Sequence, residues 1–288
     1  PRLWYMGPMF RYERPQKART RQFHQASLEV FGIEDPHIDA ELMLVASSLW
    51  QELGVNDLIS LEINSLGNLE TRKTYKGLLK KFFEPFKKDL DHDSLRKLKD
   101  NPLRILDSKS DSIKEMLKDA PNILENLDKD SLIHFNKLKE ILENLGLNYK
   151  VNQNLVRGLD YYNRSVFEWK AKKLGAQNTI CGGGRYDSLV EELGGNSCPA
   201  VGISLGIDRL ILLLEYTSIK NSGYDLGLDC FFICLEERAY TQAMLYAEKI
   251  RQKIPGINLK INLDALRAGT QFKRADKSGA KIALIVGE

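Results

Sequence analysis

The stretch Leu155-Val-Arg-Gly-Leu-Asp-Tyr-Tyr-Asn-Arg-Ser-Val-Phe-Glu168 decides how the rest of the chain is interpreted. It places one cation, Arg157, close to two phenols, Tyr161 and Tyr162, and then continues as a predicted strand at residues 165–169. A guanidinium binds carboxylates or phosphates, and phenol hydroxyls bind polar rings, so the cluster suits a pocket for a small zwitterion. Taken alone, the same residues also fit an amphipathic edge strand with a solvated arginine.

A second arginine-rich segment lies near the start of the chain, at residues 7–29. Residues 9–13 predict a strand, and residues 14–20 predict a polar loop, because Pro15 cannot continue a ladder. Residues 21–29 predict a returning strand whose alternation sends four side chains to one face: Phe23, Gln25, Ser27 and Glu29. If this row faces the core, Glu29 needs a solvated cleft or a cationic partner. The alternative is a surface hairpin with scattered charges.

Four motifs in order along the chain resemble those of one enzyme family. Residues 10–25 resemble motif 2 of class II aminoacyl-tRNA synthetases, specifically of histidyl-tRNA synthetases. Residues 155–168 and Cys181-Gly-Gly-Gly-Arg-Tyr-Asp187 resemble the two histidine-specific signatures of that family. Ala200-Val-Gly-Ile-Ser-Leu-Gly-Ile-Asp-Arg-Leu210 resembles class II motif 3. The four together are far more specific than any one of them.

The resemblance implies a histidine–tRNA ligase. Such an enzyme activates L-histidine with ATP, accompanied by Mg²⁺, to histidyl-adenylate, and then transfers the histidyl group to the 3′ end of tRNA(His). This chemistry needs cations in fixed positions around phosphates, which is electrostatic and positional catalysis. No metal site made by protein side chains is expected.

The resemblance also implies roles for individual residues. Arg11 is expected to bind the α-phosphate of ATP and Arg209 the γ-phosphate, while Arg157 stands beside the α-phosphate and the histidine carboxylate. Glu29 and Tyr162 are expected to bind the imidazole, since a carboxylate and a phenol match its two ring nitrogens. The other expected contacts are Gln25 and Tyr161 in the amino-acid site, Arg19 at ATP, and Arg14, Gln16 and Lys17 at ATP or the tRNA acceptor end.

The chain departs from the family pattern at three positions. Ala18 and Ser27 stand where glycine is common, and Asp208 stands where motif 3 commonly has glutamate. The loop conformation and the pocket floor are therefore expected to differ slightly, but no charge that the chemistry needs is lost. The run Gly182-Gly-Gly184 has no following Lys-Ser/Thr, so we expect it to allow close backbone approach beside a ligand or strand, not to form a phosphate-binding loop.

The order of elements predicts a mixed α/β (α+β) chain of two domains. By resemblance, residues 1–225 form a class II catalytic core on an antiparallel sheet, with a helical insertion at residues 87–149 that approaches the tRNA acceptor arm. Residues 226–288 alternate as βαβαβ, which predicts a parallel sheet with right-handed crossovers. This part is similar to a truncated anticodon-binding domain of three α/β layers.

Composition limits the class of partner and the compartment. The net charge of +3 is only mildly basic, so nucleic-acid contacts must come from local patches. No apolar run reaches about 18 residues, which argues against a membrane span. Four cysteines without a CxxC pair or metal spacing predict reduced thiols and a cytoplasmic location: Cys181, Cys198, Cys230 and Cys234.

Two other functions stay open on the sequence alone. A histidyl-synthetase-like regulatory subunit of ATP phosphoribosyltransferase would sense histidine without catalysis, but it typically erodes the signature at residues 155–168 and lacks the C-terminal domain. The synthetase-like sensor domain of a stress kinase typically loses motif arginines, whereas Arg11, Arg157 and Arg209 are present. The chain also starts inside motif 2 and stops within its last domain. We therefore expect a fragment of a longer, homodimeric protein, without motif 1, with an exposed apolar surface and little aminoacylation of its own.

Overall fold

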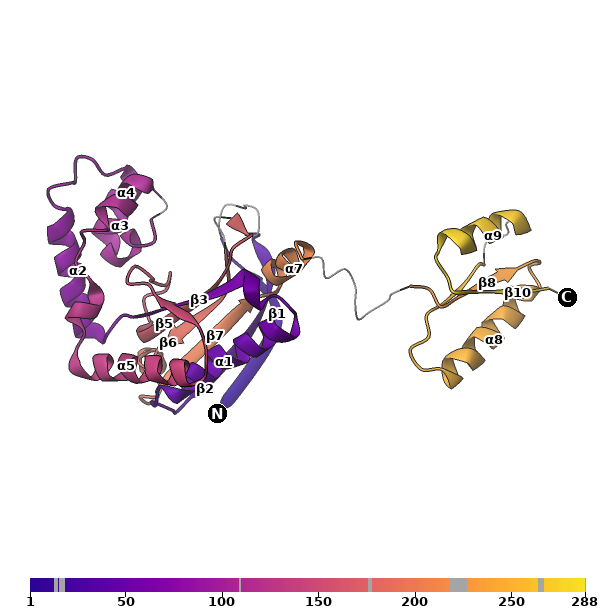
Figure 1. Ribbon diagram of the computed structural model, residues 1–288, viewed down its shortest axis with the longest axis horizontal. Coiled ribbons are helices and arrows are strands. Elements are labelled where there is room, and N and C mark those ends of the chain that lie inside the picture. Colours follow the sequence, from indigo (N-terminus) through magenta and orange to yellow (C-terminus); the bar gives the residue numbers. More distant parts are fainter. Residues whose placement is uncertain are drawn as a thin grey trace. The chain divides into compact units, whose positions relative to one another are not determined.

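The computed structural model describes residues 1–12, 15, 19–108, 110–175, 178–217, 227–263 and 267–287. The chain divides into two compact units, Pro1–Ile219 and Lys220–Glu288, each described here by itself (Figure 1). The predicted domain boundary after residue 225 lies outside the described residues.

Within the described part of the first unit, seven strands form one sheet in the order β1-β2-β7-β6-β5-β3-β4. Neighbouring strands are antiparallel except β3 and β4, which are parallel. The strands are β1 (Arg2–Phe10), β2 (Gln22–Phe31), β3 (Ile59–Ser65), β4 (Tyr149–Val151), β5 (Asn163–Ala171), β6 (Thr179–Arg185) and β7 (Ala200–Gly206). The mainly antiparallel sheet of the predicted fold class is confirmed.

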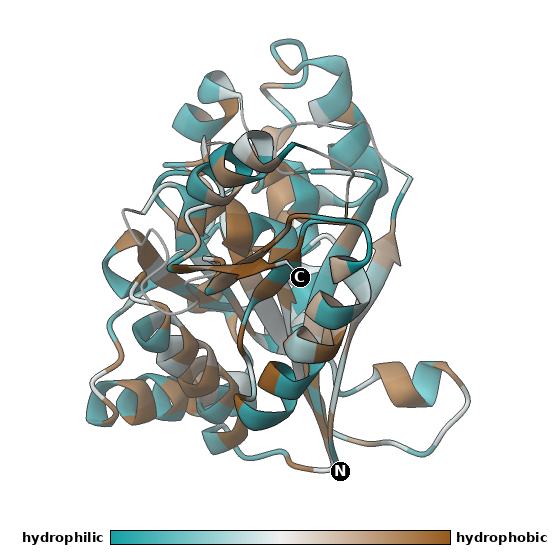
Figure 2. Cartoon of the chain, turned by 90° about the vertical axis from the view of Figure 1, so that its right-hand side faces the viewer, coloured by the Kyte–Doolittle hydropathy of each residue, from teal (hydrophilic) through white to brown (hydrophobic). Residues whose placement is uncertain are grey.

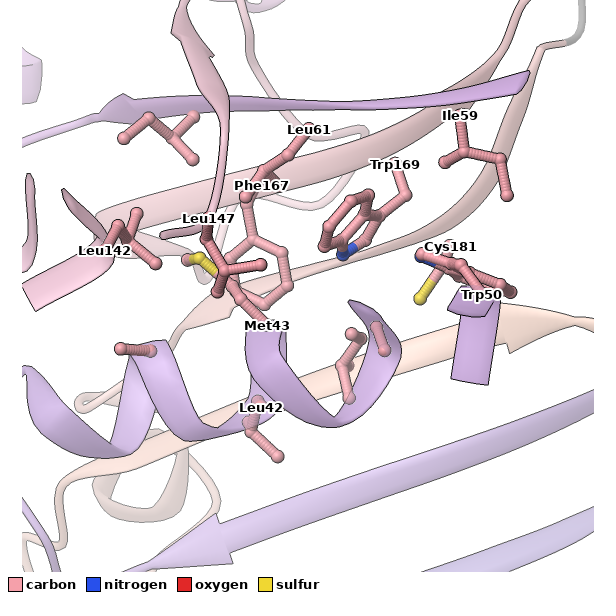
Figure 3. Packing of buried hydrophobic residues seen from close by; sticks show 14 of the residues in the cluster. Leu42, Met43, Trp50, Ile59, Leu61, Leu142, Leu147, Phe167, Trp169 and Cys181 are labelled. Atoms are coloured by element: carbon pink, nitrogen blue, oxygen red, sulfur yellow. The ribbon is translucent and has the colours of Figure 1, made fainter. Parts of the chain in front are cut away.

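Helices α1 (His37–Glu52) and α5 (Lys129–Asn144) pack against one face of this sheet through a shared hydrophobic cluster. Figure 3 shows Met43 and Trp50 of α1 directed toward Phe167 and Trp169 of β5. Trp50 and Trp169 meet edge to face, with ring centroids 6.1 Å apart. Each such buried side chain contributes roughly 1.5–3 kcal/mol to folding. The layer of α1 and α5 therefore stabilises the sheet from one face and leaves the opposite face to other parts of the chain.

A second hydrophobic cluster joins a layer of short helices to the middle of the sheet. The helices are α2 (Leu69–Phe83), α3 (His92–Asp100), η2 (Pro102–Ile105), α4 (Asp111–Met116) and η3 (Ile123–Asn126). Tyr75 and Phe83 of α2 pack in one cluster with Leu155, Tyr162 and Tyr186. Helix α2 therefore packs in the same cluster as α3 and α4, whereas α5 packs with α1 and the sheet. That residues 87–149 form a helical insertion stays a prediction.

The edge strand β1 exposes large apolar side chains. Trp4 and Phe10 are each 74% exposed and Met6 is 65% exposed. The strand predicted at residues 9–13 begins earlier, at Arg2, and ends at Phe10, although Arg11 still donates its backbone N–H to Arg21 at 2.9 Å. All residues of β1 are exposed or half-buried, with Gly7 and Met9 the half-buried ones, because the strand lies at the sheet edge.

The second unit is a parallel three-stranded sheet in the order β10-β8-β9, covered on both faces. Its elements are β8 (Cys230–Cys234), α8 (Ala239–Lys253), β9 (Leu259–Ile261), α9 (Ala268–Lys277) and β10 (Ile282–Val286). Ala243 of α8 packs on one face of β8, and Ala275 of α9 packs on the other. Figure 2 shows the strand beside the C-terminal label in the hydrophobic colour, between helices of mixed hydropathy. The predicted βαβαβ order with a parallel sheet is confirmed.

The four cysteines are free thiols, and Cys181, Cys230 and Cys234 are buried. Burial raises the pKa of the Cys181 thiol far above its ordinary value, which keeps it protonated and unreactive. Among the described residues, no helix has both the length and the apolar character that a membrane crossing requires.

Candidate functional site

A cavity of about 250 Å³ lies over strands β2, β6 and β7 of the first unit. Its lining includes Arg11, Gln25, Arg157, Ser204, Asp208 and Arg209. Four of these six were predicted as site residues, and they come from segments far apart in the sequence.

The alternation of β2 determines which side chains reach this site. Leu28 and Val30 belong to the hydrophobic cluster under α1 and α5, so side chains of the opposite parity point to the other face of the sheet. Phe23 and Gln25, of that opposite parity, line the cavity. The row that includes Glu29 therefore faces away from the cluster under α1 and α5 and toward the cavity, which is the cleft alternative of the sequence analysis. Both rows carry apolar residues, so parity alone could not choose between them.

Arginines gather at one end of the cavity. The Arg11 guanidinium lies 4.2 Å from the centroid of the Phe23 ring, which holds it flat against β2. Arg209 extends from α7 (Ile207–Glu215). Burial lowers the pKa of Arg209, and the charges of Arg11, Arg19 and Arg157 lower it further. Cations that disfavour one another's charge create a strongly positive end, which is suited to a polyanion.

Helix α7 is joined to β2 beside these arginines. Asp208 accepts a hydrogen bond from the backbone N–H of His24 at 2.8 Å, and its other oxygen lies 3.7 Å from His24 Nδ1. The aspartate that replaces the common glutamate thus reaches the main chain of the neighbouring strand. The other predicted residues of this end, Arg14, Gln16 and Lys17, lie outside the described residues.

Two residues that the sequence did not single out link the arginines. Arg157 donates a hydrogen bond to Glu168, and Glu168 accepts another from the Thr179 hydroxyl at 2.9 Å. The carbonyl oxygen of Thr179 in turn accepts a hydrogen bond from Arg209. Burial disfavours the charge on Arg157, but Glu168 and Tyr162 outweigh it and raise its pKa. Arg157 is therefore a fixed cation between the two ends of the site.

The other end holds a carboxylate among three phenols. Tyr186 donates a hydrogen bond to Glu29, and the Tyr161 ring lies 4.7 Å from that of Tyr162 and 5.7 Å from that of Tyr186 between centroids. Burial raises the pKa of Glu29, and the Tyr186 hydrogen bond partly opposes this. Tyr186 lies within a motif quoted in the sequence analysis, but no role was predicted for it. The nearest hint in the sequence was the prediction that Tyr161 and Tyr162 bind a polar ring. A Cβ on Gly202 would lie 1.7 Å from the Glu29 carboxylate, so the carboxylate rests directly on β7.

The glycine run of β6, the strand beside β7, also lets side chains of the site lie close to the backbone. A Cβ on Gly182 would lie 2.7 Å from Nη1 of Arg157, and one on Gly184 would lie 2.9 Å from the Tyr162 ring. The run therefore lets both side chains lie against the strand. This is the close approach that the sequence predicted for these glycines.

A row of polar groups connects the two ends along β2. Gln25 donates to the Ser27 hydroxyl at 3.0 Å, and the Ser27 hydroxyl lies 2.9 Å from that of Ser204. Ser27 is 1% exposed. The serine that replaces the common glycine therefore fills the floor beside the cavity and orients the Gln25 amide.

A buried ion pair anchors β6 from behind. Arg185 and Asp39 are both fully buried and paired, and Ser165 donates a second hydrogen bond to the same carboxylate. Arg185 also donates to the carbonyl oxygen of Ile33 at 3.0 Å. Because Arg185 directly precedes Tyr186, this pair fixes the strand from which the Tyr186 hydroxyl reaches Glu29.

The structure thus brings Arg11, Gln25, Arg157 and Arg209 around one cavity, with Arg19 acting on its charge. Glu29, Tyr161 and Tyr162 form the adjoining phenol end and are not part of the cavity lining. The arrangement joins a positively charged cavity, through one cation, to an adjoining cluster of a carboxylate and phenols. The role of each residue stays a prediction.

Comparisons with known proteins give the family and the fold of the chain. Residues 1–210 match the family model for histidyl-tRNA synthetase, and residues 229–288 match the model for an anticodon binding domain. The apo histidyl-tRNA synthetase of S. aureus is 35% identical, with a TM-score of 0.76 over 99% of this chain and 68% of that one.

Two more distant structures share the fold. A histidyl-tRNA synthetase from Nostoc sp. is 21% identical, with a TM-score of 0.64 over 98% of this chain and 69% of that one. A Bacillus halodurans protein described as an ATP phosphoribosyltransferase regulatory subunit/histidyl-tRNA synthetase is 21% identical, with a TM-score of 0.61 over 99% and 73%. At this identity the likeness concerns the fold alone.

Proposed function

Because the chain belongs to the histidyl-tRNA synthetase family, we propose that it is a histidine–tRNA ligase. It activates L-histidine with ATP to histidyl-adenylate and transfers the histidyl group to the 3′ end of tRNA(His). One observation carries the proposal: a cavity lined by Arg11 and Arg209, whose positive charge Arg19 reinforces, is linked through Arg157 to the cluster of Glu29 and its phenols.

The first step uses the cations of this site. A carboxylate oxygen of histidine attacks the α-phosphorus of ATP, and the bond to the β-phosphate oxygen breaks to release pyrophosphate. Arg157 stands where the carboxylate and the α-phosphate meet, Arg11 binds the α-phosphate, and Arg209 binds the γ-phosphate. A preorganised donor of this kind is worth about 2.7–4 kcal/mol in the transition state. The Glu168–Thr179 link holds two of these arginines in register.

Recognition of histidine belongs to the phenol end. An ionised Glu29 accepts the N–H of one imidazole nitrogen, and the Tyr162 hydroxyl meets the other. Tyr186 holds the Glu29 carboxylate, and Tyr161 closes the stack of rings. Gln25, fixed by Ser27, binds the polar backbone of the amino acid.

Mg²⁺ enters with ATP in this proposal. Among the described residues, no three His, Cys, Asp or Glu side chains are grouped as metal ligands. The one acid that lines the cavity, Asp208, hydrogen-bonds to β2.

The tRNA and a second copy of the chain are the proposed macromolecular partners. Residues 229–288 supply the anticodon-binding domain, and Arg14, Gln16 and Lys17 are proposed to meet the acceptor end. The exposed apolar edge of β1, with Trp4 and Phe10, is proposed to be covered in a homodimer, because such an edge otherwise favours aggregation. We place the protein in the cytoplasm.

The decisive experiment is histidine-dependent exchange of pyrophosphate into ATP, measured on the full-length protein. Arg157→Ala and Arg209→Ala are each expected to lower exchange at least about a hundredfold. The matched control is Arg96→Ala, which removes an exposed arginine of α3. Near-normal exchange with Arg157→Ala would contradict its role. Histidine binding without exchange in the unsubstituted protein would favour a regulatory subunit, which needs the phenol end but not the positive end.

A further inference from the structure

The segment that carries Arg157, Tyr161 and Tyr162 has no regular secondary structure. Residues 152–162, named here the recognition loop, form neither helix nor strand. Asn64 of β3 holds its start by donating to the carbonyl oxygens of Gln153 at 3.1 Å and Leu155 at 3.0 Å. Without a strand ladder, the rest of the loop depends on other side chains for its position.

The middle of the recognition loop is held from the helical layer. Arg72 of α2 donates to the carbonyl oxygen of Asp160 at 2.6 Å. The Asp160 carboxylate accepts a hydrogen bond from Asn101 and lies 3.7 Å from Nη2 of Arg104. Arg104 also donates to the carbonyl oxygen of Gly158 at 3.3 Å. These residues form what we name the anchor cluster, and it binds two peptide groups between Arg157 and Tyr161.

The anchor cluster is rigid on the helical side and exposed on the loop side. Arg72 is 7% exposed and Asn101 is 6% exposed, and the Asn101 amide oxygen also accepts the backbone N–H of Leu103 at 3.3 Å. The Asp160 side chain is 60% exposed. Burial lowers the pKa of Arg72, and the charge of Asp160 opposes this. Two of the donors, Arg72 and Asn101, are therefore held in place by packing, whereas Arg104 is half exposed and the acceptors belong to the loop.

We propose that Arg72 and Asp160 are positioning residues, through which the helical layer sets the placement of the recognition loop and thereby the affinity for histidine. The proposal rests on the proposed function for the identity of the ligand. The hydrophobic cluster that includes Tyr75 of α2 also includes Leu155 and Tyr162, so the same layer supports the loop by packing. The other cations of the cavity are held by β2, β6 and α7, and Arg157 of the loop is held by Glu168 of β5, so ATP affinity depends less on the anchor cluster than histidine affinity does.

The test combines two measurements on the full-length protein. Hydrogen–deuterium exchange reports the protection of the recognition loop, and titration calorimetry gives separate affinities for histidine and ATP. Asp160→Ala and Arg72→Gln are expected to speed exchange across residues 158–162 and to weaken histidine binding by about tenfold to a hundredfold. Exchange in β5 and β6, and ATP affinity, should change less than about twofold.

Two further variants separate positioning from general damage. Asp160→Asn keeps a side-chain oxygen that can accept from Asn101, which Asp160→Ala removes, so it should retain most of the histidine affinity. Asp119→Ala removes an exposed acid elsewhere in the helical layer and should change nothing. Because Asp160 is exposed, Asp160→Ala decides the matter if Arg72→Gln does not fold.

Either of two results overturns the proposal: an unchanged recognition loop in Asp160→Ala, or equal losses of histidine and ATP affinity. A different result would remove the proposed function. If the unsubstituted protein bound no histidine, the ligand assignment would be wrong, and the exchange data alone would confirm or overturn the anchoring of the loop by Arg72 and Asp160.

Discussion

Replacing Gly202 by alanine should damage histidine recognition without unfolding the protein. Gly202 lies on β7 opposite Glu29 of β2, and a Cβ there would lie 1.7 Å from one carboxylate oxygen of Glu29 and 3.0 Å from the other. The obstacle is the end of a flexible side chain, so the carboxylate can move aside. It must then move by more than an ångström, away from the Tyr186 hydroxyl that it accepts from.

The size of the effect follows from the contact that is lost. A hydrogen bond to a charged group contributes about 1.5–3 kcal/mol, and each 1.4 kcal/mol is about a factor of ten in affinity. Histidine affinity should therefore fall by about tenfold to a hundredfold. Alanine in a strand is favoured over glycine by roughly 0.5–1 kcal/mol, which offsets part of the strain, so the melting temperature should change little.

The assay is titration calorimetry with histidine and with ATP, accompanied by thermal unfolding. Gly7→Ala is the matched control, because a Cβ at this residue of β1 would meet nothing within 4 Å. A folded Gly202→Ala variant that keeps its histidine affinity within about twofold would refute the reasoning, as would an equal loss in Gly7→Ala.

Three other changes test separate parts of the structure. Burial raises the pKa of Glu29, so the folded state binds that proton more tightly than the unfolded state does. Glu29→Gln should therefore raise the unfolding free energy at neutral pH, and this gain should vanish as the pH falls below the ordinary glutamate range. The same variant should weaken histidine binding far more than ATP binding. Equal losses of the two affinities in calorimetry would mean that Glu29 does not bind histidine. Arg185→Met leaves Asp39 buried and uncompensated, and should lower the unfolding free energy by about 3–5 kcal/mol in denaturant titrations, whereas a small loss would mean that water reaches the site. Trp4→Lys adds a charge to the apolar β1 edge and should shift sedimentation toward monomer; an unchanged profile would place the interface elsewhere.

The sequence predicted the architecture because its motifs span both the sheet and the cavity. The glycine run at residues 182–184 and the βαβαβ pattern near the end of the chain each reflect a local rule, and local rules can be read without a structure. The link from Arg157 through Glu168 and Thr179 could not be read in this way. A register shift interrupts the pairing of β5 with β6 at Trp169, so counting along the strands does not reveal which residues meet.

The orientation of β2 was ambiguous for a related reason. Phe23 on one row and Leu28 on the other are both large and apolar, and only α1 and α5 decide which row is covered. The anchor cluster was hidden because it joins α2 and η2 to a loop 88 and 54 residues away, through main-chain carbonyls that leave no trace in the amino-acid pattern.

One hydrophobic cluster is shared by the helical layer and the phenol end of the site, so the helical layer is not an independent module of this protein. Tyr75 and Leu79 of α2 pack in one continuous core with Tyr162 and Tyr186, so the layer supplies the wall behind the phenols. A chimera that received its helices from another member of the family would have a different wall, even if every residue around the proposed histidine site were kept. Exchanging the helical layer therefore also changes the affinity for the amino acid. Substitutions in the layer and substitutions around the phenols should occur together when related sequences diverge.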